Sequence, residues 1–163
     1  MRQIPLGAKG SFNLLVQPEH LADRFKDAML PPVFATPVMI MVMENAALTA
    51  IRAYLDPGES AVGTAVNVRH LAATPVGCLV SGEAESLNQK PTSANRRLPL
   101  TAFETHNGRS TFAAGTALHA PKRKIAGRQI EFAVRATEGA KEIGVGSHSR
   151  VIIDVAKFTQ RLG

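Results

Sequence analysis

The sequence predicts an α+β protein in which an antiparallel sheet curves around one long buried helix. The chain has 163 residues, 45% of them apolar, which is enough for one domain with a single core. A stretch over residues 37–55 is apolar on every face of a helix in its first half, so it needs apolar contacts on most of its circumference. After residue 60 the hydrophobic pattern changes to the period of two that is typical of strands.

The long helix is expected over residues 37–55. Thr36 supplies a hydroxyl at the N-cap, and Pro37 fits the first turn because no N–H is needed there. The turn sequence Asp-Pro-Gly-Glu at 56–59 follows the end of the helix. These signals define both limits of the element that the sheet has to cover.

Strands and short helices complete the expected fold. A strand and a short helix or turn precede the long helix, and four strands with hairpin-like links and a C-terminal helix follow it. The expected ranges are 11–17 (strand), 18–25 (helix or turn), 60–70, 78–86, 128–138 and 141–154 (strands), and 155–162 (helix). In the first of the four strands, alternation places the even-numbered residues from Val62 to His70 on one face. A sheet of this kind around one apolar helix is the hotdog architecture, here as a single domain over 1–163.

The positive charge of the chain is concentrated in one segment. Residues 88–124 hold seven of the 19 basic side chains but only one acidic side chain, Glu104, so the rest of the chain is neutral. The segment shows no helical or strand period and is rich in Ser, Thr, Asn, Pro and Ala. We therefore expect a disordered insertion with no essential role. The alternatives are a basic contact with nucleic acid or an acyl carrier, and translated non-coding sequence. Because the body is neutral, nucleic acid is not an expected partner.

Composition excludes several other classes of protein. Cys78 is the only cysteine, which rules out an internal disulfide and a cysteine-based zinc site. No His, Asp and Glu residues have the spacing of metal ligands, so no metal and no cofactor are expected. The longest apolar run, 37–43, is far shorter than the ~20 residues that cross a bilayer, so no membrane partner is expected. The N-terminus shows no apolar signal region, and we expect a cytoplasmic protein.

Thr36, Glu44, Gly63 and His70 are the residues that could carry chemistry. Each has an ordinary structural explanation: a helix cap, a buried structural acid, a strand bulge, and a satisfied histidine at a strand end. Together they offer a hydroxyl at a helix N-terminus, a carboxylate two turns further along, a backbone N–H open to a ligand, and an imidazole. A hydroxyl, an imidazole and a carboxylate near oriented N–H groups are what acyl transfer requires.

Two runs of the sequence resemble the fluoroacetyl-CoA thioesterase-like family of hotdog proteins. The run 33–77 contains Phe-Ala-Thr-Pro, Met-Glu-Asn-Ala-Ala and His-Leu-Ala-Ala-Thr-Pro, and the run 142–154 reads Glu-Ile-Gly-Val-Gly-Ser-His-Ser-Arg-Val-Ile-Ile-Asp. The resemblance covers nearly all of the chain outside the charged segment. It implies a catalytic group formed by Thr36, Glu44 and His70.

The resemblance also implies substrate contacts and an oligomeric state. Gly63 corresponds to a glycine that helps to hold the thioester carbonyl. Arg150 corresponds to an arginine near the active site, and its alternatives are a contact with the CoA phosphates, a pair with a dimer partner, or a cover for the sheet edge. With the backbone N–H near Val38 at the helix start, Gly63 would stabilise the oxyanion. The family implies a homodimer that takes an acyl-CoA substrate. The sequence has only a short segment at 26–32, where the fluoroacetate-specific enzyme has a longer phenylalanine-bearing lid, so selectivity for fluoroacetyl groups is not expected.

We therefore expect an acyl-CoA thioesterase that hydrolyses a small or medium acyl-CoA to the free acid and CoA. Thr36 is the nucleophile or positions the attacking water, His70 is the general base and then acid, and Glu44 orients His70 or stabilises its charged form. The alternative is a non-catalytic protein that binds acyl-CoA or another hydrophobic ligand. A hotdog hydratase or dehydratase is a further alternative, but that reaction usually needs an Asp–His pair, and no Asp lies between Asp56 and Asp154.

Overall fold

The structure, a computed structural model, describes residues 3–91 and 128–162. A strand and two short helical turns precede one long helix, and four strands and a short helix follow it. These elements are β1 (Lys9–Leu15), η1 (Pro18–His20), α1 (Ala22–Phe25), α2 (Thr36–Arg52), β2 (Glu59–His70), β3 (Leu79–Pro91), β4 (Arg128–Glu138), β5 (Lys141–Asp154) and α3 (Val155–Thr159). Their order and type are those that the sequence predicts.

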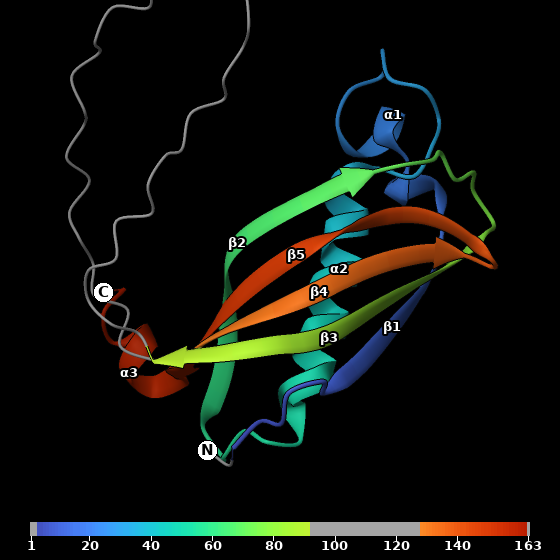
Figure 1. Ribbon diagram of the computed structural model, residues 1–163. Helices are drawn as coiled ribbons and strands as arrows, with labels where there is room; N and C mark the ends of the chain where they lie inside the picture. The colour runs from blue at the N-terminus through green and yellow to red at the C-terminus, as the bar shows by residue number, and fades with distance from the viewer. Residues whose placement is uncertain (1–2, 92–127, 163) are drawn as a thin grey trace, which may run out of the picture.

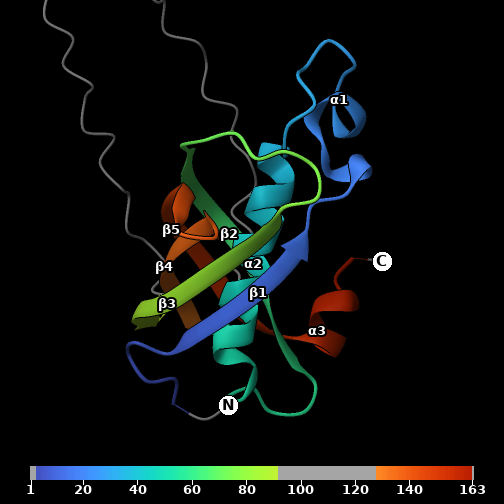
Figure 2. The same ribbon diagram turned by 90° about the vertical axis from the view of Figure 1, so that its right-hand side faces the viewer.

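The strands form one antiparallel sheet in the order β1-β3-β4-β5-β2. The hairpins β3–β4 and β4–β5 occupy its centre, and β1 and β2 are its edges. Figures 1 and 2 show the sheet curving around α2, which lies along its concave side. The expected α+β architecture, a sheet wrapped around one helix, is confirmed.

Close backbone contacts join α2 to the sheet. A Cβ added to Gly10 of β1 would collide with the backbone nitrogen of Ala50, and one added to Gly82 of β3 would lie 2.6 Å from Cγ1 of Val42. Glycine is required at both positions because a side chain would push the strand off the helix.

α2 has 17 residues, and no helix in the described parts of the chain is long and apolar enough to cross a membrane.

α2 begins one residue earlier than expected, which changes the role of Thr36. The N-cap is Ala35, and no side chain caps the helix, so the expectation that Thr36 is the N-cap is wrong. Pro37 lies in the first turn, as expected. The helix ends at Arg52, three residues before the expected end. The Thr36 hydroxyl is therefore available to a partner outside the helix.

A β-bulge interrupts the alternation expected along β2. The pairing with β5 shifts by one residue at Thr64, which has no partner of its own in the register. Before the bulge the odd-numbered Ala61 is buried, whereas after it the even-numbered Val68 packs against the core. The expectation that Val62 and Thr64 share a face with Val68 and His70 is therefore wrong, because the extra residue reverses the alternation.

β3 continues further than expected. It extends from Leu79 to Pro91, and Pro91 pairs with Arg128 at the start of β4. Residues 88–91, expected to begin an insertion, are thus strand residues. The rest of the predicted disordered insertion, 92–124, lies outside the described residues.

The first strand and the short helices are of the type that the sequence predicts, but they begin or end at other residues. β1 begins and ends two residues early, and the segment 18–25 divides into η1 and α1. α3 ends at Thr159, three residues before the expected end. At its start Asp154 Oδ1 accepts a hydrogen bond from the backbone N–H of Lys157 at 3.0 Å, which is a side-chain cap.

Candidate active site

The start of α2 and the end of β2 meet in a hydroxyl–imidazole pair. Thr36 Oγ1 lies 2.9 Å from His70 Nδ1, a hydrogen-bond distance. Thr36 is exposed and His70 is half-buried, so a substrate can reach the hydroxyl. The backbone N–H of Leu71 donates to the Ile143 carbonyl at 2.8 Å and holds the strand end that carries the imidazole. The structure thus brings together two of the residues that the sequence singles out.

The surroundings of His70 favour its neutral form. Burial lowers the pKa of the imidazole, and the backbone of Ala72 partly opposes this shift. Its Nε2 is buried and has no hydrogen-bond partner among the described residues. A neutral imidazole whose Nδ1 faces the Thr36 hydroxyl can accept the proton of that hydroxyl.

Glu44 lies in a different place from this pair. Its Oε1 is 3.5 Å from Nε2 of His148 and would be 2.6 Å from a Cβ at Gly63, so it packs against β2 and β5. Glu44 follows Thr36 by eight positions along the helix, a rise of about 12 Å. The expected contact between Glu44 and His70 does not occur within one chain. The Glu44 side chain is 36% exposed, which contradicts the expectation of a buried acid.

His148 is a functional candidate that sequence reasoning missed. It is 2% exposed, its Nδ1 lies 3.0 Å from the Ala65 carbonyl, and its Nε2 lies 3.2 Å from Nη1 of Arg150. A carbonyl only accepts and a guanidinium only donates, so Nδ1 carries the proton and Nε2 is an acceptor. Burial lowers the pKa of His148, which agrees with a neutral ring. The imidazole that Glu44 faces is therefore neutral.

The missed residue was detectable from the sequence. Alternate residues of β5 face the core: Gly144 lies against α2, Ile152 is buried, and His148 and Arg150 occupy two inward positions between them. Polar side chains on the buried face of a strand need partners, and such residues are candidates for a site. The bulge in β2 then supplies the Ala65 carbonyl that His148 contacts.

Arg150 is buried beside Glu44 and is engaged with the backbone. It is 8% exposed, and it donates to the carbonyls of Glu44 and Ala61 and contacts His148. Burial lowers the pKa of its guanidinium, and the carboxylate of Glu44 opposes this shift. This arrangement favours a structural role for Arg150 over the expected contact with substrate, because its hydrogen bonds hold β2 and α2 together.

The two expected oxyanion donors differ in their surroundings. The backbone N–H of Val38 donates to the Ala35 carbonyl at 3.0 Å, and the side chain is 4% exposed in the core. The expectation that Val38 offers a free N–H is therefore wrong. Gly63 is exposed and lies at the bulge beside Glu44, so of the two it is the position that a ligand can approach.

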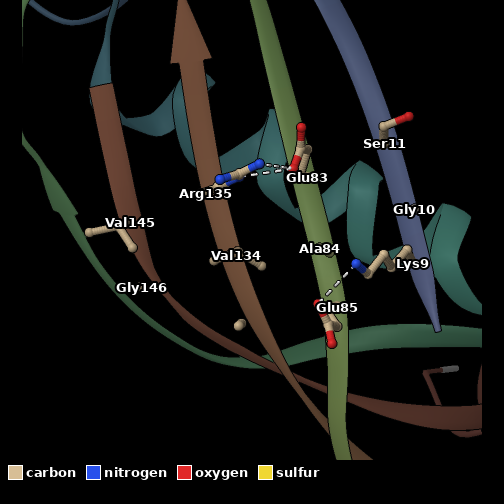
Figure 3. A pocket seen from close by; sticks show the side chains of 11 residues that line it. Lys9, Gly10, Ser11, Glu83, Ala84, Glu85, Val134, Arg135, Val145 and Gly146 are labelled. Atoms are coloured by element: carbon tan, nitrogen blue, oxygen red, sulfur yellow. Dashed lines mark hydrogen bonds and ion pairs between the residues drawn. The ribbon is translucent and has the colours of Figure 1, made fainter. Parts of the chain in front are cut away.

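A pocket of about 580 Å³ lies on the face of the sheet that points away from α2, across β1, β3, β4 and β5 (Figure 3). Its charged side chains pair with one another: Lys9 Nζ lies 3.6 Å from Glu85 Oε2, and Arg135 Nη2 lies 2.6 Å from Glu83 Oε2. It is lined by neither Thr36 nor any other predicted site residue. In residues 3–91 and 128–162, no group of three or more His, Cys, Asp or Glu could hold a metal.

Comparison with solved structures supports a thioesterase of the hotdog class. A fluoroacetyl-CoA thioesterase in complex with fluoroacetate has a TM-score of 0.70 and 27% identity over 98% of this chain and 96% of that one. A thioesterase superfamily member from Thermus thermophilus also has a TM-score of 0.70 and 27% identity, over 99% and 93% of the two chains. A hot-dog-like protein from Thermanaerovibrio acidaminovorans, 14% identical with a TM-score of 0.65, shares the fold. The fold and the hydroxyl–imidazole pair together define a thioester hydrolase of the hotdog class.

Sequence comparison then gives the family. The family model of the fluoroacetyl-CoA-specific thioesterase FlK matches residues 16–120. The fluoroacetyl-CoA thioesterase of Streptantibioticus cattleyicolor is 33% identical over 135 residues, which is 83% of this chain and 71% of that protein. The chain belongs to the family of fluoroacetyl-CoA-specific thioesterases.

Proposed function

We propose that the protein hydrolyses a small or medium acyl-CoA thioester to the free acid and CoA. The observation that carries this proposal is the 2.9 Å contact between Thr36 Oγ1 and His70 Nδ1 at the N-terminus of α2. The comparisons support it, because two of the proteins named above are fluoroacetyl-CoA thioesterases, and a threonine-to-serine variant of such an enzyme was solved in complex with acetyl-CoA. The alternative is a protein that binds acyl-CoA without turnover.

The contact supports two routes for the reaction. In one, His70 takes the proton of the Thr36 hydroxyl, the oxygen attacks the thioester carbonyl, the C–S bond breaks and His70 returns a proton to the CoA thiolate; water then hydrolyses the ester. In the other, Thr36 positions a water, His70 takes its proton, the water oxygen attacks the thioester carbonyl, the C–S bond breaks and His70 returns the proton to the CoA thiolate. Rapid quenching and mass spectrometry distinguish the routes: an acyl ester on Thr36 shows the first, and an unmodified Thr36 during turnover shows the second.

The activity is tested by CoA release from a panel of acyl-CoAs, with wild type and His70→Ala side by side. Turnover that collapses in the variant supports the thioesterase and gives its acyl preference. A folded wild-type protein that binds acyl-CoA but releases no CoA would instead support the binding protein.

We propose further that the protein is a homodimer, because the two halves of the site lie too far apart in one chain. Gly63 and His70 are separated by roughly 20 Å of strand, and Glu44 lies beside the former. β2 is an edge of the sheet, and residues 63–67 along it are exposed. Two copies of β2 can pair antiparallel so that His70 of one chain lies opposite Gly63 of the other. The centre of this pairing would lie between Val66 and Asn67. It would bring the partner's Glu44 to the hydroxyl–imidazole pair.

Complementation between two inactive variants tests this arrangement. In a mixed dimer of His70→Ala and Glu44→Ala chains, a shared site regains His70 from one chain and Glu44 from the other, so activity returns. If both residues act within one chain, every site keeps one defect and activity stays absent. Light scattering after gel filtration measures the oligomeric state independently, and a monomer would contradict the proposal.

Location and other partners remain predictions. Cys78 is a free thiol, which agrees with a reducing compartment, and we propose the cytoplasm. No nucleic acid or membrane partner is proposed, because the excess of basic residues is confined to residues 88–124.

A further inference from the structure

The loop over residues 72–77 is joined to both segments that carry the hydroxyl–imidazole pair. It begins two residues after His70, at the end of β2. Its Thr74 carbonyl accepts a hydrogen bond from the backbone N–H of Phe34 at 2.8 Å, two residues before Thr36. The position of the hydroxyl relative to the imidazole therefore depends on where this loop lies.

A carboxylate on a different strand holds this loop. Thr74 is 0% exposed, and its Oγ1 donates to Oε2 of Glu138, at the end of β4, at 2.9 Å. Lys141 adds a second connection, because its Nζ donates to the Ala73 carbonyl at 2.9 Å and lies 3.7 Å from Glu138 Oε2. The hairpin between β4 and β5 is thus tied to the loop by two side chains.

The groups around Glu138 keep it ionised. The Cys78 thiol and the Thr74 hydroxyl both hydrogen-bond to the carboxylate and hold its pKa below the usual range, with a smaller contribution from Lys141. The same contact raises the pKa of the Cys78 thiol. In the described parts of the chain, Glu138 touches neither Thr36 nor any other residue assigned to the reaction.

We infer that Glu138 is a positioning residue for thioester hydrolysis. Its carboxylate fixes Thr74, the Thr74 carbonyl fixes the segment that leads into Thr36, and the Thr36 hydroxyl is thereby held at His70. This inference rests on the proposed function. It predicts that loss of the carboxylate lowers turnover more than it weakens substrate binding.

The test compares Glu138→Ala with two related variants and one matched control. Glu138→Gln keeps an oxygen that can accept from Thr74, so it should restore most of the activity. Thr74→Val removes the same hydrogen bond at similar volume, and it serves where Glu138→Ala does not fold. Glu83→Ala is the control, because Glu83 is an exposed carboxylate paired with Arg135 on the outer face of the sheet.

Turnover is followed by loss of thioester ultraviolet absorbance, because a thiol reagent would also react with Cys78. We expect kcat to fall about 10-fold or more in Glu138→Ala and Thr74→Val, with KM changed less than about two-fold. Glu83→Ala should leave both constants within about two-fold of wild type. Equal kcat in Glu138→Ala and Glu83→Ala, with both folded, would overturn the inference.

Two measurements separate positioning from a merely structural role. Alkylation of Cys78 should become faster in Glu138→Ala, which shows that the contact is lost. NMR titration of His70 should then give a midpoint nearer 6.5, because a displaced loop exposes the ring. Faster alkylation of Cys78 with no change in the His70 titration or in kcat would contradict the inference. If wild type releases no CoA, the proposed function fails, whereas the titration still tests the geometry.

Discussion

Replacing Gly63 by alanine tests whether Glu44 acts from beside this residue. A Cβ there would lie 2.6 Å from Glu44 Oε1 and 3.1 Å from His148 Cε1. The carboxylate must move by about 1 Å to restore an ordinary contact, and such a misplacement can cost about 100-fold in rate. We expect kcat to fall about 100-fold. The free energy of unfolding should change little, because the Glu44 side chain is 36% exposed and can turn towards solvent.

The assay compares kcat for acyl-CoA hydrolysis in wild type, Gly63→Ala, Glu44→Ala and the double variant. If the effect acts through the carboxylate, Gly63→Ala costs little further once Glu44 is alanine, because only the 3.1 Å contact with Cε1 of His148 then remains. The same loss in the Glu44→Ala background would refute this reasoning and assign the effect to the backbone of Gly63. Urea melts of all four proteins show whether each is folded under the assay conditions.

Packing, burial and strand pairing lead to four further predictions. Gly10→Ala should destabilise the protein by at least about 3 kcal/mol, because the new Cβ meets the α2 backbone; a urea melt that shows less than about 1 kcal/mol contradicts this packing. Burial lowers the pKa of His70, so the acid limb of kcat/KM should lie below 6.5, and a pH–rate profile checks this. Burial lowers the pKa of His148 as well, so below pH 6.5 the unfolded chain binds more protons at these two histidines than the folded protein does. The free energy of unfolding should therefore decrease as pH falls below 6.5. Equal urea midpoints at about pH 7 and about pH 5 would count against that linkage. Replacing residues 92–127 by a two-residue hairpin turn should keep fold and activity, because β3 and β4 pair as far as the two ends of this segment; a shortened chain that fails to fold would show that the segment is needed.

The fold was predictable from the sequence because its strongest signals are local. The all-round apolar character of the first half of α2 demands a cover, and the strands that supply it are separated by turn residues and show a period of two. β4 and β5 have the limits that the sequence predicts, since the hairpin at 137–140 has a clear turn signal. The end of β3 was missed because polar residues such as those at 88–91 carry no hydrophobic period, although they pair in the sheet.

The site was only partly predictable, because its assembly depends on tertiary register. Thr36 and His70 could be named as a pair, since a helix start and a strand end are visible in the sequence. A bulge at Gly63 was one of the structural interpretations, because a glycine inside a strand can mark one. The reversal of the alternation after Thr64 could not be predicted, because one extra residue leaves no mark in the hydrophobic pattern of an exposed edge. That bulge decides which residues face α2, and it places the Ala65 carbonyl at His148.

Thr36 shows how a stable helix can release a residue for chemistry. A side-chain cap contributes about 1 kcal/mol, and α3, with five residues none of which is buried, has such a cap from Asp154. α2 has no side-chain cap, but eight of its residues are buried. Each large apolar side chain among them contributes about 1.5–3 kcal/mol, so a missing cap bond is a small loss for this helix. The hydroxyl at the start of α2 can therefore be used by His70, at the helix end where the dipole favours the negative charge of an attacking oxygen.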